Sequence, residues 1–498
     1  MILDWREVEE GSTLDCDLCV IGGGAVGITL AHELAGTDLS VCLLESGGLE
    51  LDSETQELYD GVRAGMAYPP LHQTRLRFLG GTTNHWAGQS RPLDPYDFAS
   101  RGWVPESGWP MGYTVLTRYL GRAQELCGLG PLPFEWGHWG GVEELPDFPM
   151  DPQHFRPVVF RYPAPVLRFG RAYRHALERA RNIRCFLHAN VLELECDEGE
   201  TAVQRVRATS LDGHRAWVRP RATVLAAGAI ENVRLLLVSG ASGAGLGNRK
   251  DMVGRYFMEH AFYDHGKAVL DPSQGLDFFL DPWTETDAWR IRTDFQLTPE
   301  WQERMGVLNH SVHLRIRERE SHVPGPEILG RAWNRLEDVM AGVLPGDGEP
   351  FDIRIRLEHA PNRESRVTLA DRKNALGQPH ARLRLAFGEL EGRTVRTVLE
   401  RLALEMGRAE LGRVHLSFDP QDRSWTDELG WQSHHCGGTR MGNDPTDSVV
   451  DPSLRVHEVS NLYVCGSSVF PTSGHTNPTL NLVALAVRLA DHLEETLA

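Results

Sequence analysis

A glycine-rich turn near the N-terminus constrains the fold of this chain more than any other feature. Asp17–Ile21 is a short apolar run typical of a strand, and it leads directly into Gly22-Gly-Gly-Ala-Val-Gly27. Apolar residues then recur with a spacing of four along 26–34, which predicts an amphipathic helix. A second apolar run, Leu39–Leu44, ends at Glu45. The order of strand, helix and strand predicts one parallel crossover unit.

The three glycines of this turn fit a dinucleotide-binding fingerprint. Gly22 permits the tight turn, Gly24 lets the backbone approach a pyrophosphate, and Gly27 lets the helix pack closely on the strand. The N-terminus of the helix also favours phosphate charge. Glu45 stands where a carboxylate can accept a hydrogen bond from a ribose hydroxyl, and its charge disfavours a 2′-phosphate. We therefore predict one tightly held dinucleotide.

Further strand and helix patterns are spread along the chain. An apolar run at 223–228 precedes a short helical pattern at about 231–238, and a run at 461–466 precedes a long one at about 478–497. Residues 350–390 instead alternate apolar and polar, as half-buried antiparallel strands do. A second glycine string, 240–247, follows a predicted helix, so we interpret it as a C-cap and loop. The nucleotide-type pattern therefore occurs at both ends of the chain.

The predicted fold class is α/β, with a discontinuous Rossmann-like nucleotide domain and an antiparallel-sheet α+β domain that binds the substrate. The predicted bounds are 1–95, 166–258 and 431–498 for the three parts of the nucleotide domain, 96–165 for a cover segment, and 259–430 for the substrate domain.

Composition excludes several classes of protein. The chain carries 51 Lys and Arg against 69 Asp and Glu, a net charge of −18, which argues against a nucleic-acid or anionic-membrane partner. No apolar run reaches the ~18 residues of a membrane span. The N-terminus has neither a basic start nor an apolar stretch, and eight cysteines in 498 residues do not make a disulfide scaffold. We expect a cytoplasmic protein with reduced thiols.

Eight segments, in order along the chain, form a recognisable series: 17–48, Leu79–Trp86, Thr223–Asn232, Val253–His260, Pro361–Val367, His435–Gly442, Asn461–Thr472 and Asn477–Leu480. Together they resemble those of the glucose–methanol–choline (GMC) oxidoreductase family, and most of all its sugar-oxidising branch of pyranose oxidases, fructose-dehydrogenase-like subunits and glycoside oxidases. Gly466 is a departure, because many members carry an acidic residue there.

The resemblance implies FAD as the cofactor. Besides the fingerprint residues Gly22, Gly24, Gly27 and Glu45, it implies contacts with FAD at Thr82, Thr83, Asn84, His85, Val191, Gly228, Gly466, Ser467, Pro478 and Thr479. In pyranose oxidases the histidine at the spacing of His85 is covalently attached to the flavin. Similar glycoside oxidases hold flavin without a bond, so we expect noncovalent FAD, with His85 as the site of any link.

The resemblance also implies the catalytic residues. His435 begins a His-x-x-Gly-Thr motif and is predicted to be the base that takes the hydroxyl proton, which suits a side chain whose pKa lies near neutrality. Its neighbour His434 is expected to be structural, because adjacent side chains tend to point apart. Asn477 is predicted to donate to the substrate oxygen. It precedes Pro478 at the head of a helix, so the alternative is an N-cap. His475 is a candidate for the substrate pocket.

We do not expect a metal site. Cys16 and Cys19 lie three apart on a predicted strand, which sends their side chains to opposite faces, and no second pair accompanies them. Cys436 adjoins a histidine, but no other feature supports acyl transfer.

The predicted activity is FAD-dependent oxidation of a secondary ring hydroxyl of a sugar or glycoside to a ketone, by hydride transfer to flavin N5. The electrons then pass to oxygen, a quinone or another acceptor. Within the same family, the alternative is an oxidase or dehydrogenase of a choline-like or polyol substrate. The other classes are a lyase in which flavin is structural and a noncatalytic nucleotide-binding protein.

Overall fold

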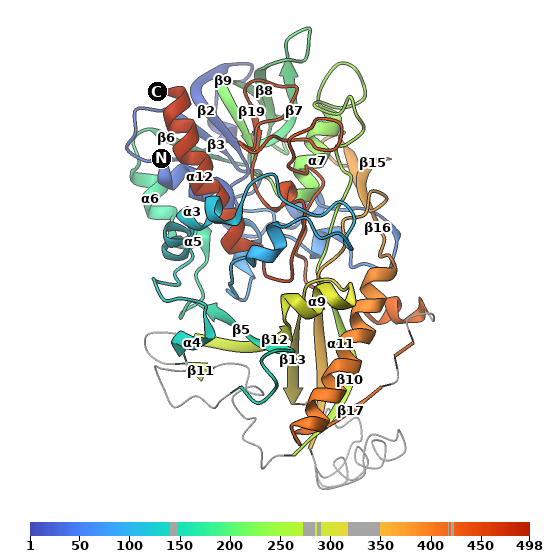
Figure 1. Ribbon diagram of the computed structural model, residues 1–498. Coiled ribbons are helices and arrows are strands. Elements are labelled where there is room, and N and C mark those ends of the chain that lie inside the picture. Colours follow the sequence, from blue (N-terminus) through green and yellow to red (C-terminus); the bar gives the residue numbers. More distant parts are fainter. Residues whose placement is uncertain (140–147, 272–283, 286–289, 317–348, 417, 420–422) are drawn as a thin grey trace, which may run out of the picture.

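The computed structural model describes residues 1–139, 148–271, 284–285, 290–316, 349–416, 418–419 and 423–498. Within these residues the chain forms two large sheets, one above the other in Figure 1, and a small third sheet beside the upper one. The second glycine string, 240–247, forms a loop, as predicted. The helix that precedes it ends at Val238.

The upper sheet contains the predicted crossover unit. Its strands run in the order β1-β6-β3-β2-β9-β8-β7, with β19 also paired to β9. The pairs around β2 are parallel, whereas β8 is antiparallel to both of its neighbours, β7 and β9. The bounds are β1 Ile2–Asp4, β2 Thr13–Ile21, β3 Val41–Leu44, β6 Ile183–Leu187, β7 Asn190–Cys196, β8 Val203–Thr209, β9 Arg215–Leu225 and β19 Leu462–Val464.

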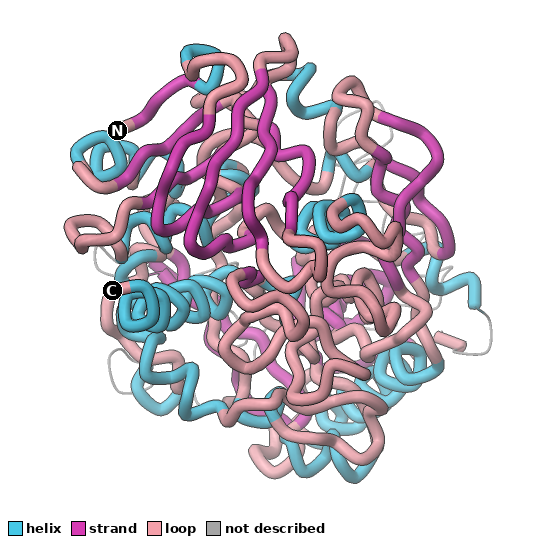
Figure 2. The backbone as a smooth tube through the Cα atoms, turned by 90° about the horizontal axis from the view of Figure 1, so that it is seen from above, coloured by secondary structure: helices cyan, strands magenta, loops and turns pink. Residues whose placement is uncertain are grey.

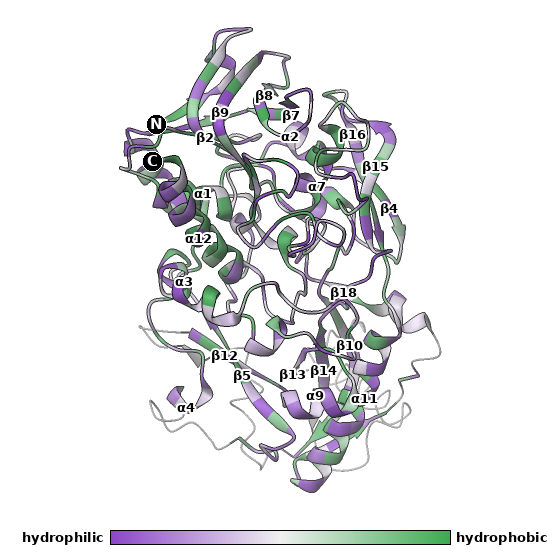
Figure 3. Ribbon diagram, turned by 45° about the horizontal axis from the view of Figure 1, so that its top comes forward, coloured by the Kyte–Doolittle hydropathy of each residue, from purple (hydrophilic) through white to green (hydrophobic). Residues whose placement is uncertain are grey.

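Helices from both ends of the chain cover this sheet. Helix α1 (Ala25–Glu33) follows the glycine turn and packs on the C-terminal helix α12 (Thr479–Leu497), which in turn packs on α3 (Tyr113–Leu126). Figures 2 and 3 show α12 as a long, largely apolar helix beside the strands. Its side chains from Leu480 to Leu493 are mostly buried, so the last residues of the chain complete the core that the first residues begin.

The lower sheet has the order β11-β12-β13-β14-β10-β17, with β5 paired to β12 and β18 paired to β10. The long helix α11 (Glu389–Arg408) packs against it, and α9 (Pro299–Met305) lies at its upper end (Figure 1). The pairings are antiparallel. The bounds are β5 Phe155–Tyr162, β10 Ala261–Leu270, β11 Thr284–Glu285, β12 Arg290–Leu297, β13 His310–Ile316, β14 Glu349–Leu357, β17 Gly412–His415 and β18 Gly430–Trp431.

The alternation in 350–390 has two different outcomes. In β14 it is the predicted half-buried antiparallel strand: Ile353, Ile355 and Leu357 are buried in the core formed with α11, while the arginines between them face the other way. Strands β15 (Arg366–Lys373) and β16 (Pro379–Leu385) instead form the third sheet with β4 (Gly61–Gly65), and β16 pairs with β4 in parallel. That sheet packs on α7 (Ala229–Val238).

The remaining helices are short connections. Their bounds are α2 Ser53–Glu57, α4 Trp136–Trp139, α5 Phe169–Ala172 and α6 Arg174–Arg179. In the described part of the chain, no helix has the length and apolar character that a membrane crossing requires. The predicted domain bounds stay predictions, and one observation bears on them: β5, from the predicted cover segment, belongs to the lower sheet.

Candidate active site

A cavity of about 570 Å³ lies between the upper and the lower sheet. That volume is within the range of cofactor and ligand sites. The glycine turn and the N-terminal ends of α1, α7 and α12 line one part of the cavity, and residues of β10, β12 and β14 line another. Segments far apart in the sequence therefore meet there, at the carboxyl ends of the parallel strands β2, β9 and β19.

The nucleotide end of the cavity has the geometry that the glycine fingerprint predicts. A Cβ on Gly27 would lie 1.9 Å from the carbonyl oxygen of Gly22, so the helix can approach the strand only with glycine there. A Cβ on Gly24 would meet no atom within 4 Å and would project into the open cavity. The backbone is therefore bare where a pyrophosphate would approach, and the first amides of α1 are free to bind it.

Glu45 lies at the end of β3 and lines the cavity. Its carboxylate accepts hydrogen bonds from the backbone N–H groups of Gly23 and Gly47, both at 2.8 Å. Burial raises its pKa, while these two amides act in the opposite direction. The side chain is therefore held in place by two backbone amides at the cavity, and a carboxylate can still accept a further hydrogen bond from a ribose hydroxyl.

Most of the other residues expected to contact FAD also line the cavity, and the exceptions have a clear structural role. Asn84 is not among the lining residues, because its amide Nδ2 donates to the carbonyl of Leu79 at 3.0 Å and supports the turn instead. Those that line the cavity are Gly22, Gly24, Glu45, Thr82, Thr83, His85, Val191, Gly228, Gly466, Ser467, Pro478 and Thr479. The residues present thus fit FAD. Noncovalent binding, with His85 unattached, stays a prediction.

The side chains of His434 and Asn477 both line the cavity and contact each other there. The Nδ2 of Asn477 donates to the Nε2 of His434 at 3.1 Å. The orientation of this amide is fixed, because its Oδ1 accepts from the Nη1 of Arg356 at 3.0 Å and a guanidinium can only donate. Asn477 is therefore not the N-cap that the sequence allowed. The helix begins at Thr479, and no side chain caps it.

These contacts also fix the tautomer of His434. Its Nε2 accepts from Asn477, so the proton of the neutral ring is on Nδ1, which lies 3.0 Å from the Nδ1 of His260. Burial, together with His260 and Arg356, holds the pKa of His434 well below its usual value. Nε2 is thus unprotonated, and its lone pair accepts from the Asn477 amide at the edge of the cavity, which is the protonation state required of a proton acceptor. The expectation that His434 is merely structural does not fit this position.

His435 has a different environment. It also lines the cavity, but its Nε2 lies 2.8 Å from the hydroxyl of Tyr68 and 3.5 Å from the Oε2 of Glu259. Tyr68 in turn donates to Glu259 at 2.6 Å. Burial lowers the pKa of His435 to about 3 and raises that of Glu259 to about 8. The other Glu259 oxygen accepts from the backbone N–H of His434 at 2.7 Å, so this cluster supports the loop that carries both histidines.

His475 does not reach the cavity. It is fully buried, it is absent from the lining residues, and its ring lies edge-on to Phe160 with the centroids 6.1 Å apart. The structure thus brings Asn477, but not His475, to the substrate side.

Sequence reasoning missed several residues of the site. The most notable are Arg356 and Gln89, which contact each other at 3.0 Å, and a buried group in which Arg75, Arg77 and Arg234 surround Glu231. For Arg356 a signal was present: the alternating pattern of β14 places it on the face opposite the core. For the others no motif was available, because their roles depend on contacts between distant segments.

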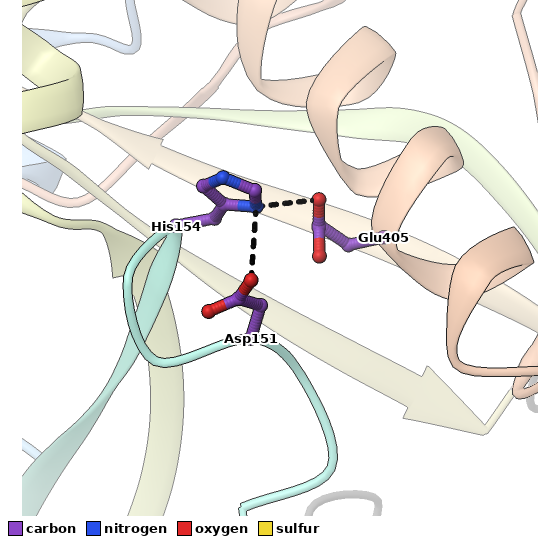
Figure 4. A group of neighbouring side chains, drawn as sticks. All are labelled: Asp151, His154 and Glu405. Carbon is purple, nitrogen blue, oxygen red and sulfur yellow. Dashed lines mark hydrogen bonds and ion pairs between the residues drawn. The ribbon is translucent and has the colours of Figure 1, made fainter.

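One cluster outside the cavity has the composition of a metal site. Glu405, on α11, lies together with Asp151 and His154 from the segment just before β5 (Figure 4). Both carboxylates approach the same nitrogen, the Nδ1 of His154, at 3.8 and 2.7 Å, and Glu405 also accepts from Arg408 at 3.0 Å. The two carboxylates therefore pair with His154 and Arg408, and we interpret the cluster as an ion-pair network.

Comparisons with known proteins agree with this geometry. Two family models match: "FAD dependent oxidoreductase" over residues 17–243 and "GMC oxidoreductase" over residues 361–486. The fructose dehydrogenase large subunit of Gluconobacter japonicus is 25% identical, over 96% of this chain and 98% of its own length. The 6'''-hydroxyparomomycin C oxidase of Streptomyces lividus is 28% identical, over 96% of this chain and 92% of its own.

A solved structure of a formate oxidase has the same fold, with a TM-score of 0.59 over 98% of this chain and 99% of that one, at 17% identity. The glycine turn, the cavity that joins the two sheets and the two family matches lead to one conclusion. The chain carries a GMC oxidoreductase C-terminal domain behind an FAD-dependent oxidoreductase domain, and it is an FAD-dependent, GMC-type oxidoreductase that acts on CH–OH donors.

Proposed function

We propose that the protein oxidises a secondary ring hydroxyl of a sugar or glycoside to a ketone, with His434 as the base. The observation that carries the proposal is the pair of His434 and Asn477 at the cavity wall, with Nε2 and Nδ2 3.1 Å apart. The names of the two relatives, a fructose dehydrogenase and an oxidase of an aminoglycoside, support a sugar-type substrate.

In this proposal the substrate hydroxyl takes the place between the two side chains. The Nε2 of His434 accepts the hydroxyl proton as the carbonyl forms, and the Nδ2 of Asn477 donates to the substrate oxygen. FAD, held at the glycine turn and Glu45, would supply the acceptor for the hydride of the carbinol carbon. His260 holds Nδ1–H of the base and Arg356 holds the amide, so both side chains keep these contacts while they move apart to admit the substrate oxygen.

His434 replaces His435 in the role of the base for a geometric reason. The Nε2 of His435 is already engaged with Tyr68 and Glu259, whereas the Nε2 of His434 contacts only the amide that would share the substrate oxygen. Because the two histidines are adjacent, the sequence motif alone does not decide which of them is the base.

The test compares His434→Ala with its neighbour. Anaerobic addition of a panel of free sugars and glycosides to the holoenzyme should bleach the flavin of the wild type. His434→Ala should slow this reduction by about 10²–10⁴-fold, the usual contribution of a positioned base. His435→Ala serves as the matched control and should lose far less. The opposite ranking would return the role of the base to His435, and substrate consumption without bleaching would identify a lyase.

A further inference from the structure

A stack of arginine and phenylalanine side chains covers the lower sheet where it faces the cavity. The guanidinium of Arg292 lies 5.4 Å from the ring centroid of Phe160, and that of Arg356 lies 5.1 Å from the same ring. Arg356 also lies 5.4 Å from the centroid of Phe262, whose ring is 4.2 Å from Arg354. The three guanidinium groups therefore alternate with two aromatic rings, and all three arginines line the cavity.

The charges in this stack do not cancel. Arg292 is paired with Asp294 at 2.9 Å, and Arg354 is paired with Asp264 through two hydrogen bonds. Arg356 has no carboxylate partner among the described residues. Its two terminal nitrogens donate to neutral amide oxygens, those of Asn477 and Gln89. Arg356 is only 4% exposed, and an unpaired buried charge is costly, so a missing anion is the natural explanation.

Two buried donors beside this charge also lack an acceptor. The Nε of Arg356 and the Nε2 of Gln89 have no hydrogen-bond partner in the described part of the chain. The orientation of the Gln89 amide is fixed, because its Oε1 accepts from Arg356. Gln89 is 6% exposed and lines the cavity. In the described part of the chain, Arg356 thus forms no ion pair with a carboxylate, although Asp294 attracts its charge, and two N–H groups buried directly behind the same wall lack an acceptor.

We propose that the substrate is an anion: a sugar acid or uronide whose carboxylate binds to Arg356 and Gln89 while its hydroxyl meets His434 and Asn477. This inference rests on the proposed function, because it names the substrate class of the same site. A carboxylate is favoured over a phosphate, because only one of the three guanidinium charges is uncompensated, which matches a single negative charge.

The same contact would link binding to chemistry. Arg356 is one of the groups that lower the pKa of both His434 and His260, and it touches the amide of Asn477. A bound carboxylate would offset that positive charge, so the Nε2 of His434 would become a stronger base when an acidic substrate is present.

The experiment uses matched pairs that differ only in the acid group. Methyl β-D-glucuronide and methyl β-D-glucoside share their ring hydroxyls, and the corresponding galacturonide and galactoside form a second pair. Binding to the oxidised holoenzyme is measured by calorimetric titration, which needs no turnover. The wild type should bind the acid of at least one pair about 10- to 100-fold more tightly than its neutral partner.

The variants assign that preference to one side chain. Arg356→Gln keeps an N–H donor for Asn477 but removes the charge, and it should abolish the preference, whereas Arg356→Lys should retain part of it. Arg396→Gln, which removes an exposed arginine of α11 far from the cavity, is the control and should change nothing.

The outcomes separate this inference from the proposed function. If acids bind through Arg356 but no alcohol bleaches the flavin, the inference stands and the proposed function fails. If neutral glycosides bleach the flavin and neither pair shows a preference that Arg356→Gln removes, the inference is overturned. A lower flavin midpoint potential in Arg356→Gln with unchanged acid preference would overturn it as well, because the charge would then serve the cofactor.

Discussion

Adjacent residues on one loop divide the work of this site. His434 and His435 point to different partners, as neighbouring side chains usually do, and the one that meets Asn477 is His434. The motifs singled out the loop and the amide as candidates, and their roles stay predictions. The sequence could not indicate which of the two rings contacts Asn477, since that depends on Tyr68 and Glu259, which lie 367 and 176 residues from His435.

The buried carboxyl of Glu259 makes stability depend on pH. Its pKa is raised from 4.5 to about 8, so the folded state binds this proton more tightly than the unfolded state. The resulting stabilisation is fully present below pH 4.5 and is lost as the pH rises through about 8. Glu259→Gln should remove the part of the pH dependence that this carboxyl causes. That part is a change in the free energy of unfolding of roughly several kcal/mol over this interval.

Urea unfolding of both proteins between pH 5 and about 8.5 measures the effect. The wild type should lose free energy of unfolding as the pH rises, and Glu259→Gln should lose less. Equal slopes would show that this carboxyl is already ionised at neutral pH.

At the scale of elements, the N-terminal end of α12 should influence the midpoint potential of the flavin. Its first residues, Pro478 and Thr479, line the cavity, so the positive end of the helix dipole points at the flavin site. Reduced flavin is an anion, so this end should favour the reduced state. Thr479→Asp places a negative charge there and should lower the midpoint potential by about 20 mV, the equivalent of ~1 kcal/mol.

Dye equilibration of the purified holoenzyme gives the potential. Thr496→Asp, at the exposed C-terminal end of the same helix, is the matched control and should leave the potential unchanged. A potential that does not move in Thr479→Asp would separate this helix from the flavin.

The alternation of apolar and polar residues predicted where strands occur, but it did not predict which strands pair with one another. The alternation of β14 correctly indicated an antiparallel strand with one apolar face, but Arg354 and Arg356 of its polar face line the cavity. The similar alternation of β16 belongs to a different sheet, because β4 supplies a parallel partner from 320 residues away. Local periodicity states which face is apolar, and it does not state what covers the other face.

At the scale of the whole molecule, a buried ion pair joins the lower sheet to a segment near the N-terminus. Both terminal nitrogens of Arg101 donate to the carboxylate of Glu358, at 2.7 and 2.6 Å, and both side chains are essentially inaccessible. Glu358 also accepts from the backbone N–H of Asn309. Arg101→Met should destabilise the protein by roughly 3–5 kcal/mol, because it leaves a buried carboxylate without its cation.

Thermal or urea unfolding measures this loss, and Arg219→Met provides the contrast. Arg219 pairs with Asp15 on the surface, so the same chemical change there should have little effect. Similar losses in the two variants would mean that the Arg101 pair is solvated.

The discontinuous nucleotide domain could be predicted because its signals are local: a glycine turn, apolar runs and a long apolar helix. The position of β5 could not, since nothing in Phe155–Tyr162 itself indicates that it pairs with β12, some 130 residues later.

The proposed base and the amide come from the last stretch of the chain, whereas the arginine stack comes from strands of the lower sheet. Under the two proposals, reactivity and selectivity would be encoded in separable stretches of the gene, with Arg356 as the residue that joins them. A library confined to codons 262, 292, 354 and 356 would then vary the choice of alcohol, provided that the residue at 356 keeps an N–H donor for the amide of Asn477.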